Sequence, residues 1–115
     1  MNISQSVNNG VTVFTVNGRI DTQGALELEQ ALQSAVQSGQ HKMVLDVTNV
    51  RYINSSALRT LADVLTENRE NKGDLFLVGI APRIRRVFEI IGFDKFFIFY
   101  DGIEKAVADY EMPVK

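Results

Sequence analysis

The sequence predicts an α/β fold, in which about four α-helices cover a mixed central sheet made of an N-terminal hairpin plus parallel strands. Three observations predict this architecture. Asn9-Gly10 stands between two strand-like stretches and is a strong hairpin signal. After the hairpin, helical and strand patterns alternate, which favours parallel strands joined by helical crossovers. Lys42–Val47 is almost continuously apolar, as is typical of a central strand covered on both faces.

The hairpin and the first helix follow from local patterns. Residues Ile3–Val7 are expected to pair with a strand that begins at Val11, where valines alternate with polar residues. A helix is predicted from about Thr22, because apolar residues then recur at helical spacing, and Gly39 is suited to end it as a C-cap.

The central strand is expected to lead through a loop at residues 48–54 into a second helix. Asn54 is among the best N-cap residues, and the segment after it carries a helical apolar stripe. Ser55 and Ser56 are therefore predicted to be the first helical residues, with the helix closing around Lys72-Gly73.

Further elements are predicted in the last third of the chain. Leu75–Val78 has the pattern of a buried strand, and Pro82 stands where a third helix can begin without a backbone N–H. Gly92 is expected to end that helix, and Phe96–Tyr100 to form the last strand. Asp101 has capping-box spacing to Glu104 and is predicted to cap a C-terminal helix.

The bulk composition indicates an ordinary globular protein of one domain, residues 1–115, with a core from about residue 3 to 110. Its 115 residues can bury a core without disulfides or a metal, and the net charge of -2 gives no electrostatic reason to expect direct nucleic-acid binding. No membrane insertion is expected, because no apolar run approaches membrane-spanning length. The absence of cysteine excludes thiol catalysis and cysteine-ligated metal sites. With no signal sequence or spanning segment recognised, a cytoplasmic location is expected.

A switch by phosphorylation is the chemistry that Ser55 and Ser56 suggest. Hydroxyls in the first turn of a helix lie beside free backbone N–H groups and the positive end of the helix dipole, which favour a phosphate. One phosphoryl group would add nearly two negative charges to a neutral surface. Taken alone, however, two serines after a capping asparagine are typical of ordinary helix starts and give only weak support for regulation.

Catalysis has little support in the sequence. The lone His41 is interpreted as a solvated loop residue, and no nucleophile elbow or phosphate-binding loop is present, so a hydrolase that uses Ser55 is a weak hypothesis. No cofactor or metal ion is expected. Asp46 either faces a ligand at the strand end or anchors the following loop through backbone N–H bonds.

Two clusters remain open to more than one interpretation. The arginines of the third helix (Arg83, Arg85, Arg86) are expected to form a solvated face that could also meet an acidic patch on a partner. The aromatic residues Phe93, Phe96, Phe97, Phe99 and Tyr100 are expected to pack mainly against the last helix, with an exposed patch as the alternative.

Three motifs together resemble the STAS domain (sulphate transporter and anti-sigma factor antagonist) in its short bacterial form. Residues 18–21 read GRID, similar to the family's G-x-[IL]-D before the first helix. Residues 46–58 read DVTNVRYINSSAL, similar to its central D-[LV]-[ST]-x-[VL]-x-[FY]-[IM]-D-S-[ST]-G-L signature. Residues 79–93, with a proline start and a closing glycine, are similar to its third-helix segment, so the resemblance extends from about Ile3 to Tyr110.

The resemblance implies a function in partner switching. In this family the antagonist binds an anti-sigma factor that is also a GHKL-type serine kinase, phosphorylation of the antagonist undoes the binding, and a PPM-type phosphatase restores it. Carried over by position, the phosphate acceptor is Ser55. The partner-binding residues implied are Asp21, Thr48, Asn54, Ser55, Ser56 and Leu58. A phosphate on Ser55 is expected to lie close to Asp21 and Asp46, where like charges would repel it.

Three residues depart from the family pattern. Asn54 stands where Asp is usual and removes a negative charge beside the acceptor, Ala57 replaces a usual Gly, and Arg19 replaces a frequent acidic residue. These changes keep a second hypothesis open, in which the chain is a constitutively binding STAS scaffold or accessory subunit of a transporter or another complex.

Overall fold

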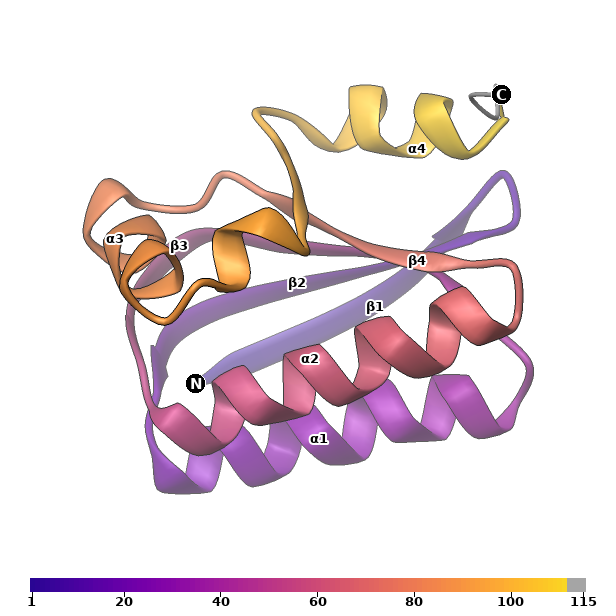
Figure 1. The fold of residues 1–115 in the computed structure, drawn as a ribbon. Helices are drawn as coiled ribbons and strands as arrows, with labels where there is room; N and C mark the ends of the chain where they lie inside the picture. The colour runs from indigo at the N-terminus through magenta and orange to yellow at the C-terminus, as the bar shows by residue number, and fades with distance from the viewer. Residues whose placement is uncertain (112–115) are drawn as a thin grey trace.

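The computed structural model describes residues 1–111, which form a five-stranded sheet flanked by helices (Figure 1). The sheet order is β1-β2-β3-β4-β5; β1 and β2 pair antiparallel, and the later neighbours pair parallel, so the predicted mixed sheet is confirmed. The elements in chain order are β1 Asn2–Asn8, β2 Val11–Ile20, α1 Thr22–Gln37, β3 Lys42–Ile53, α2 Ser55–Glu70, β4 Asp74–Val78, α3 Pro82–Ile90, the 3₁₀ turn η1 Phe93–Lys95, β5 Ile98–Tyr100 and α4 Ile103–Glu111.

Helices cover both faces of the sheet. In Figure 1, α1 and α2 run side by side along one face, and α4 lies on the other. The larger core lies under α1 and α2, and Ile84 and Phe88 of α3 extend it. A smaller core joins Ala106 and Val107 of α4 to valines of β2 and β3 and to Phe76. Because α1 and α2 both follow parallel strands, their N-termini meet at the same end of the sheet.

Strand β3 is longer than the sequence predicts. It continues to Ile53, so the prediction of a loop at residues 48–54 is wrong for all but Asn54. Between the pairs Thr15–Asp46 and Ile20–Ile53, β2 advances five residues while β3 advances seven, because the register with β2 shifts twice and places two extra residues in β3. Bulges of this kind bend a strand and change which side chains share a face.

The C-terminal elements also differ from the prediction. The last strand is limited to Ile98–Tyr100, because Phe93–Lys95 forms a 3₁₀ turn. Helix α4 begins at Ile103, so Gly102, and not the predicted Asp101, occupies the cap position. Within residues 1–111, no helix is both long enough and apolar enough to span a bilayer.

The aromatic segment divides between the two cores and the surface. Phe97 is buried and meets Phe88 of α3 edge-on, while Phe96 is 59% exposed. Tyr100 lies beside Phe76 in the α4 core. The expected packing against the last helix is therefore correct for Tyr100 only.

Candidate functional site

The N-termini of α1 and α2 lie next to each other at one end of the sheet. Ile20 and Ile53 are register partners, and the Asn54 backbone N–H donates to the Ile20 carbonyl at 3.0 Å. Asp21 caps α1, its carboxylate accepting from the Gly24 N–H at 2.9 Å. The two predicted site residues Asp21 and Asn54 are therefore brought together by the pairing of the strands that precede them.

The two serines have different surroundings. Asn54 caps α2 as predicted, and its side-chain oxygen accepts from the Ala57 N–H at 2.9 Å and from the Ser56 hydroxyl at 3.1 Å. Both serines are exposed. The hydrogen bonds found within residues 1–111 include none made by the Ser55 hydroxyl. Ser55 is thus the more available of the two for modification.

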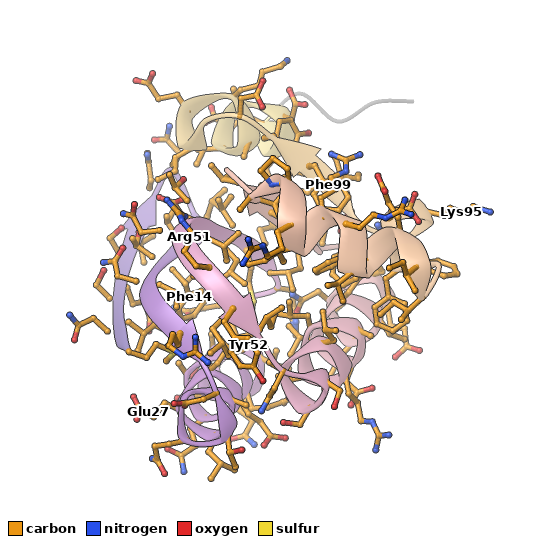
Figure 2. All side chains as sticks on the ribbon, turned by 90° about the vertical axis from the view of Figure 1, so that its left-hand side faces the viewer. Phe14, Glu27, Arg51, Tyr52, Lys95 and Phe99 are labelled. Atoms are coloured by element: carbon orange, nitrogen blue, oxygen red, sulfur yellow. The ribbon has the colours of Figure 1, made fainter. Side chains whose placement is uncertain are left out.

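A stacked pair, which sequence reasoning missed, lies beside the caps. The Arg19 guanidinium lies 4.3 Å from the centre of the Tyr52 ring, and the two residues are register partners across β2 and β3. Tyr52 is 40% exposed and is labelled in Figure 2, which looks onto this end of the molecule. In the sequence, Arg19 is notable as a departure from the family pattern. Its pairing with Tyr52 could not be predicted, because it depends on β3 extending to Ile53.

Asp46 and Thr48 lie further back along β3. The Asp46 carboxylate accepts from the Thr48 N–H at 3.0 Å and from its hydroxyl at 2.6 Å, which favours the anchoring interpretation of Asp46. Between Asp46 and Ile53 the paired strand β2 advances five residues, roughly 16 Å at the usual rise per residue. The expectation that a phosphate on Ser55 would lie close to Asp46 is therefore wrong, whereas Asp21 stays near.

Thr48 is instead placed against the turn after β4. Gly79 there has φ +71°, and its α-carbon approaches the Thr48 side chain so closely that a side chain at position 79 would collide with it. Thr48 therefore packs closely against the turn that precedes α3, and its hydroxyl donates to Asp46.

Leu58 and His41 are not at the exposed site. Leu58 is only 6% exposed and belongs to the larger core, so it offers a partner little surface. His41 lies in the predicted loop before β3, but it is half-buried and its Nδ1 lies 3.2 Å from the side-chain oxygen of the buried Asn68. The described residues 1–111 contain no group of three His, Asp or Glu side chains placed to hold a metal ion.

Comparisons with known proteins show the family and support the fold. The family model for the STAS domain matches residues 2–106. BtrV of Bordetella bronchiseptica, provisionally named an anti-sigma factor antagonist, is 31% identical over 111 residues, with 96% of each chain covered. A crystal structure of an anti-sigma factor antagonist from Mycobacterium paratuberculosis superposes with a TM-score of 0.85 at 28% identity, covering 96% of this chain and 93% of the other.

The fold is shared more widely. The phosphorylated form of the Bacillus cell fate determinant SpoIIAA superposes with a TM-score of 0.75 at 16% identity, covering 93% of this chain and 97% of the other. Because the family model spans nearly the whole chain, the protein belongs to the STAS domain family. Its relatives include proteins named as anti-sigma factor antagonists.

Proposed function

We propose that this protein is an anti-sigma factor antagonist that is switched by phosphorylation of Ser55. In its unmodified form it binds an anti-sigma factor that carries a GHKL-type serine kinase domain, through a surface that includes Asp21, Asn54 and Ser55. Phosphorylation of Ser55 weakens this complex, and a PPM-type phosphatase restores it. The protein performs no catalysis of its own.

The observation that carries the proposal is the free hydroxyl of Ser55 at an exposed helix start. The residue lies in the first turn of α2, beside backbone N–H groups that favour a phosphate. Ser56, by contrast, donates its hydroxyl hydrogen to the Asn54 cap. A phosphate on Ser55 brings nearly two negative charges and a strong requirement for solvation into a surface that the partner must cover.

A mass measurement tests the assignment. The wild type, Ser55→Ala and Ser56→Ala are incubated with the purified kinase of the source bacterium and ATP, and intact masses are read. We expect one added phosphoryl group on the wild type and on Ser56→Ala, and none on Ser55→Ala. A full shift on Ser55→Ala would remove Ser55 as the acceptor.

A constitutive scaffold is the second candidate, and Asn54 is the observation that favours it. The asparagine keeps the helix cap but lacks the carboxylate usual beside the acceptor. If the wild type binds its partner and gains no phosphate in the same incubation, the scaffold is the better description. Recovery of a membrane transport complex with the tagged chain would support it further.

A further inference from the structure

Three arginines lie around the end of β3 that leads to Ser55. Arg19 stacks on Tyr52, and Arg51 follows Val50 in the bulged part of β3. Arg51 and Arg83, from the first turn of α3, line one open groove of about 600 Å³ that also includes Thr48 and Pro82. Figure 2 shows Arg51 and Tyr52 on the same strand, on the side of the molecule that faces the viewer.

These three guanidinium groups have no carboxylate partner among the described residues. The ion pairs found within residues 1–111 are Arg69–Asp74, Arg86–Glu89 and Lys105–Asp109. The two carboxylates nearest along the chain, Asp21 and Asp46, are already held by hydrogen bonds from Gly24 and Thr48. These hydrogen bonds come from neutral groups, so both carboxylates keep their charge, and three guanidinium groups against two carboxylates leave a local excess of one positive charge in a chain whose net charge is -2.

Two of the arginines are held in place before any partner arrives. The Arg19 guanidinium is fixed against the Tyr52 ring at 4.3 Å, and Arg51 donates to the Thr48 carbonyl at 2.9 Å. Side chains ordered in the free protein lose less conformational entropy on binding, and the planar fork of arginine matches a carboxylate. The arrangement thus suits acidic side chains on a folded partner.

We propose that Arg19, Arg51 and Arg83 form a basic docking surface that binds an acidic patch on the anti-sigma factor. The inference rests on the proposed function and adds the chemistry of the partner's contact surface. It also identifies a source of repulsion for the switch, because a phosphate on Ser55 would offset these positive charges and face the partner's carboxylates.

A protein partner fits this surface better than a nucleic acid does. Three arginines and an overall acidic chain fall short of the 6–10 phosphate contacts typical of strong electrostatic binding to DNA. The surface also adjoins the exposed Ser55, where a partner that modifies the serine has to approach.

The test compares two variants of equal net charge. Arg19→Gln/Arg51→Gln/Arg83→Gln removes the basic surface, and Lys42→Gln/Lys72→Gln/Lys95→Gln removes three charges elsewhere. Dissociation constants for the purified anti-sigma factor kinase are measured by calorimetry at 50 mM and 500 mM NaCl. We expect the arginine variant to bind about 30-fold more weakly at low salt and within about threefold of the wild type at high salt. The lysine variant should match the wild type within about threefold at low salt.

Two further variants separate charge from folding. Arg19→Lys/Arg51→Lys/Arg83→Lys keeps the charge and should recover most of the binding at low salt. If the triple glutamine variant does not give a cooperative thermal melt, Arg51→Gln/Arg83→Gln, which leaves the stack on Tyr52 intact, replaces it with an expected loss of about tenfold.

The outcomes distinguish this inference from the function on which it rests. If the arginine variant binds as tightly as the wild type at both salt concentrations, the proposal of a basic docking surface is overturned. The proposed function is not affected by that result. No binding of the wild type overturns the proposed function itself. If a 20-base-pair DNA duplex binds the wild type more tightly than the kinase does, and the arginine variant loses that binding, the surface belongs to a nucleic acid and the inference is overturned.

Discussion

The two ends of the sheet differ in whether their polar side chains are buried with internal partners or exposed. At the end that holds Asn68 and the start of β3, one polar side chain is buried and forms internal hydrogen bonds, while Lys42 and Lys72 are exposed. Asn68 is fully buried, donates to the Asp74 carbonyl at 3.1 Å and is paired with His41. At the end that holds Ser55, the serine hydroxyl and the guanidinium of Arg19 are exposed and reach no acidic partner in the described residues.

This difference in burial indicates which polar side chains stabilise the fold and which are available to bind a partner. Within residues 1–111, every buried side-chain nitrogen or oxygen has a hydrogen-bond partner. Buried polar groups must be satisfied internally because an unpaired one costs about 1–3 kcal/mol. We therefore expect the partner-binding groups among exposed side chains, and the comparison predicts that substitutions at the two ends affect different measurements.

The largest loss of stability is expected from Asn68→Ala. The substitution leaves the Asp74 carbonyl and the His41 ring without their partner in a partly buried place. We expect the free energy of unfolding, measured with urea, to fall by about 2 kcal/mol while partner binding by the folded fraction stays unchanged. Asn71→Ala, which removes an exposed side-chain bond to the Glu67 carbonyl, is the control and should cost less than about 1 kcal/mol.

At the Ser55 end, Asp21 has both a structural and a proposed binding role, and two substitutions separate them. Asp21→Ala removes the α1 cap and should cost about 1 kcal/mol of stability, whereas Asp21→Asn keeps the cap and removes the charge. The sequence alone suggests that Asp21→Lys weakens partner binding with little effect on stability, but lysine cannot accept the bond from Gly24. If Asp21→Asn binds the kinase with wild-type affinity in calorimetry, the Asp21 charge is not part of the interface.

A loss of stability at high pH is expected from the contacts of α4. Burial raises the pKa of Tyr110, whose hydroxyl donates to the Met43 carbonyl at 2.6 Å, well above its ordinary value of 10.0. Burial, together with the bond to Asp109, likewise raises the pKa of Tyr100. A raised folded-state pKa contributes stability that is present below the unfolded-state value and is lost as the pH rises past it.

Urea midpoints at pH 8, 10 and 11 measure this effect. We expect the wild-type midpoint to fall between pH 10 and pH 11, and Tyr100→Phe/Tyr110→Phe to show a smaller fall because neither phenylalanine titrates. Equal falls for the two proteins would assign the alkaline loss to other groups. The variant should bind the partner at pH 8 as the wild type does, since both tyrosines belong to the α4 side of the sheet.

The smallest change in stability is expected from Asn54→Asp, which should nonetheless change the switch. A carboxylate can accept the same bonds from Ala57 and Ser56, so the free energy of unfolding should move by less than about 0.5 kcal/mol. If the missing carboxylate slows phosphorylation, the initial rate of phosphate transfer from ATP by the kinase should rise severalfold. Equal rates would mean that the asparagine does not limit phosphorylation.

Most of the fold could be predicted because its signals are local. The start of α1, the cap of α2, the proline start of α3 and the Asn9-Gly10 hairpin each depend on a few neighbouring residues, and all appear where expected. The second half of β3 could not be predicted because Val47, Val50 and Ile53 face the core at intervals of three. Its two extra residues destroy the alternation by which a strand is recognised.

Some residues of the candidate site could be predicted from the sequence and others could not. The order of polar and apolar residues indicated Asn54 as the cap and Ser55 as a helix start, because capping depends on sequence neighbours. The same pattern placed Leu58 on the apolar stripe of α2, and its burial agrees with that stripe more than with the partner-binding role that the family resemblance implied.

The sequence by itself determined the order of the main strands and helices, the starts of α1, α2 and α3 and the membership of the STAS family, since each depends on short motifs. Only the tertiary structure decided what surrounds Ser55. The pairing of β2 with the bulged part of β3 brings Arg19 onto Tyr52, although 33 positions separate them in the chain. The turn at Gly79 brings Arg83 to the groove that Arg51 lines. Such neighbours depend on strand register, which two extra residues in one strand are enough to change.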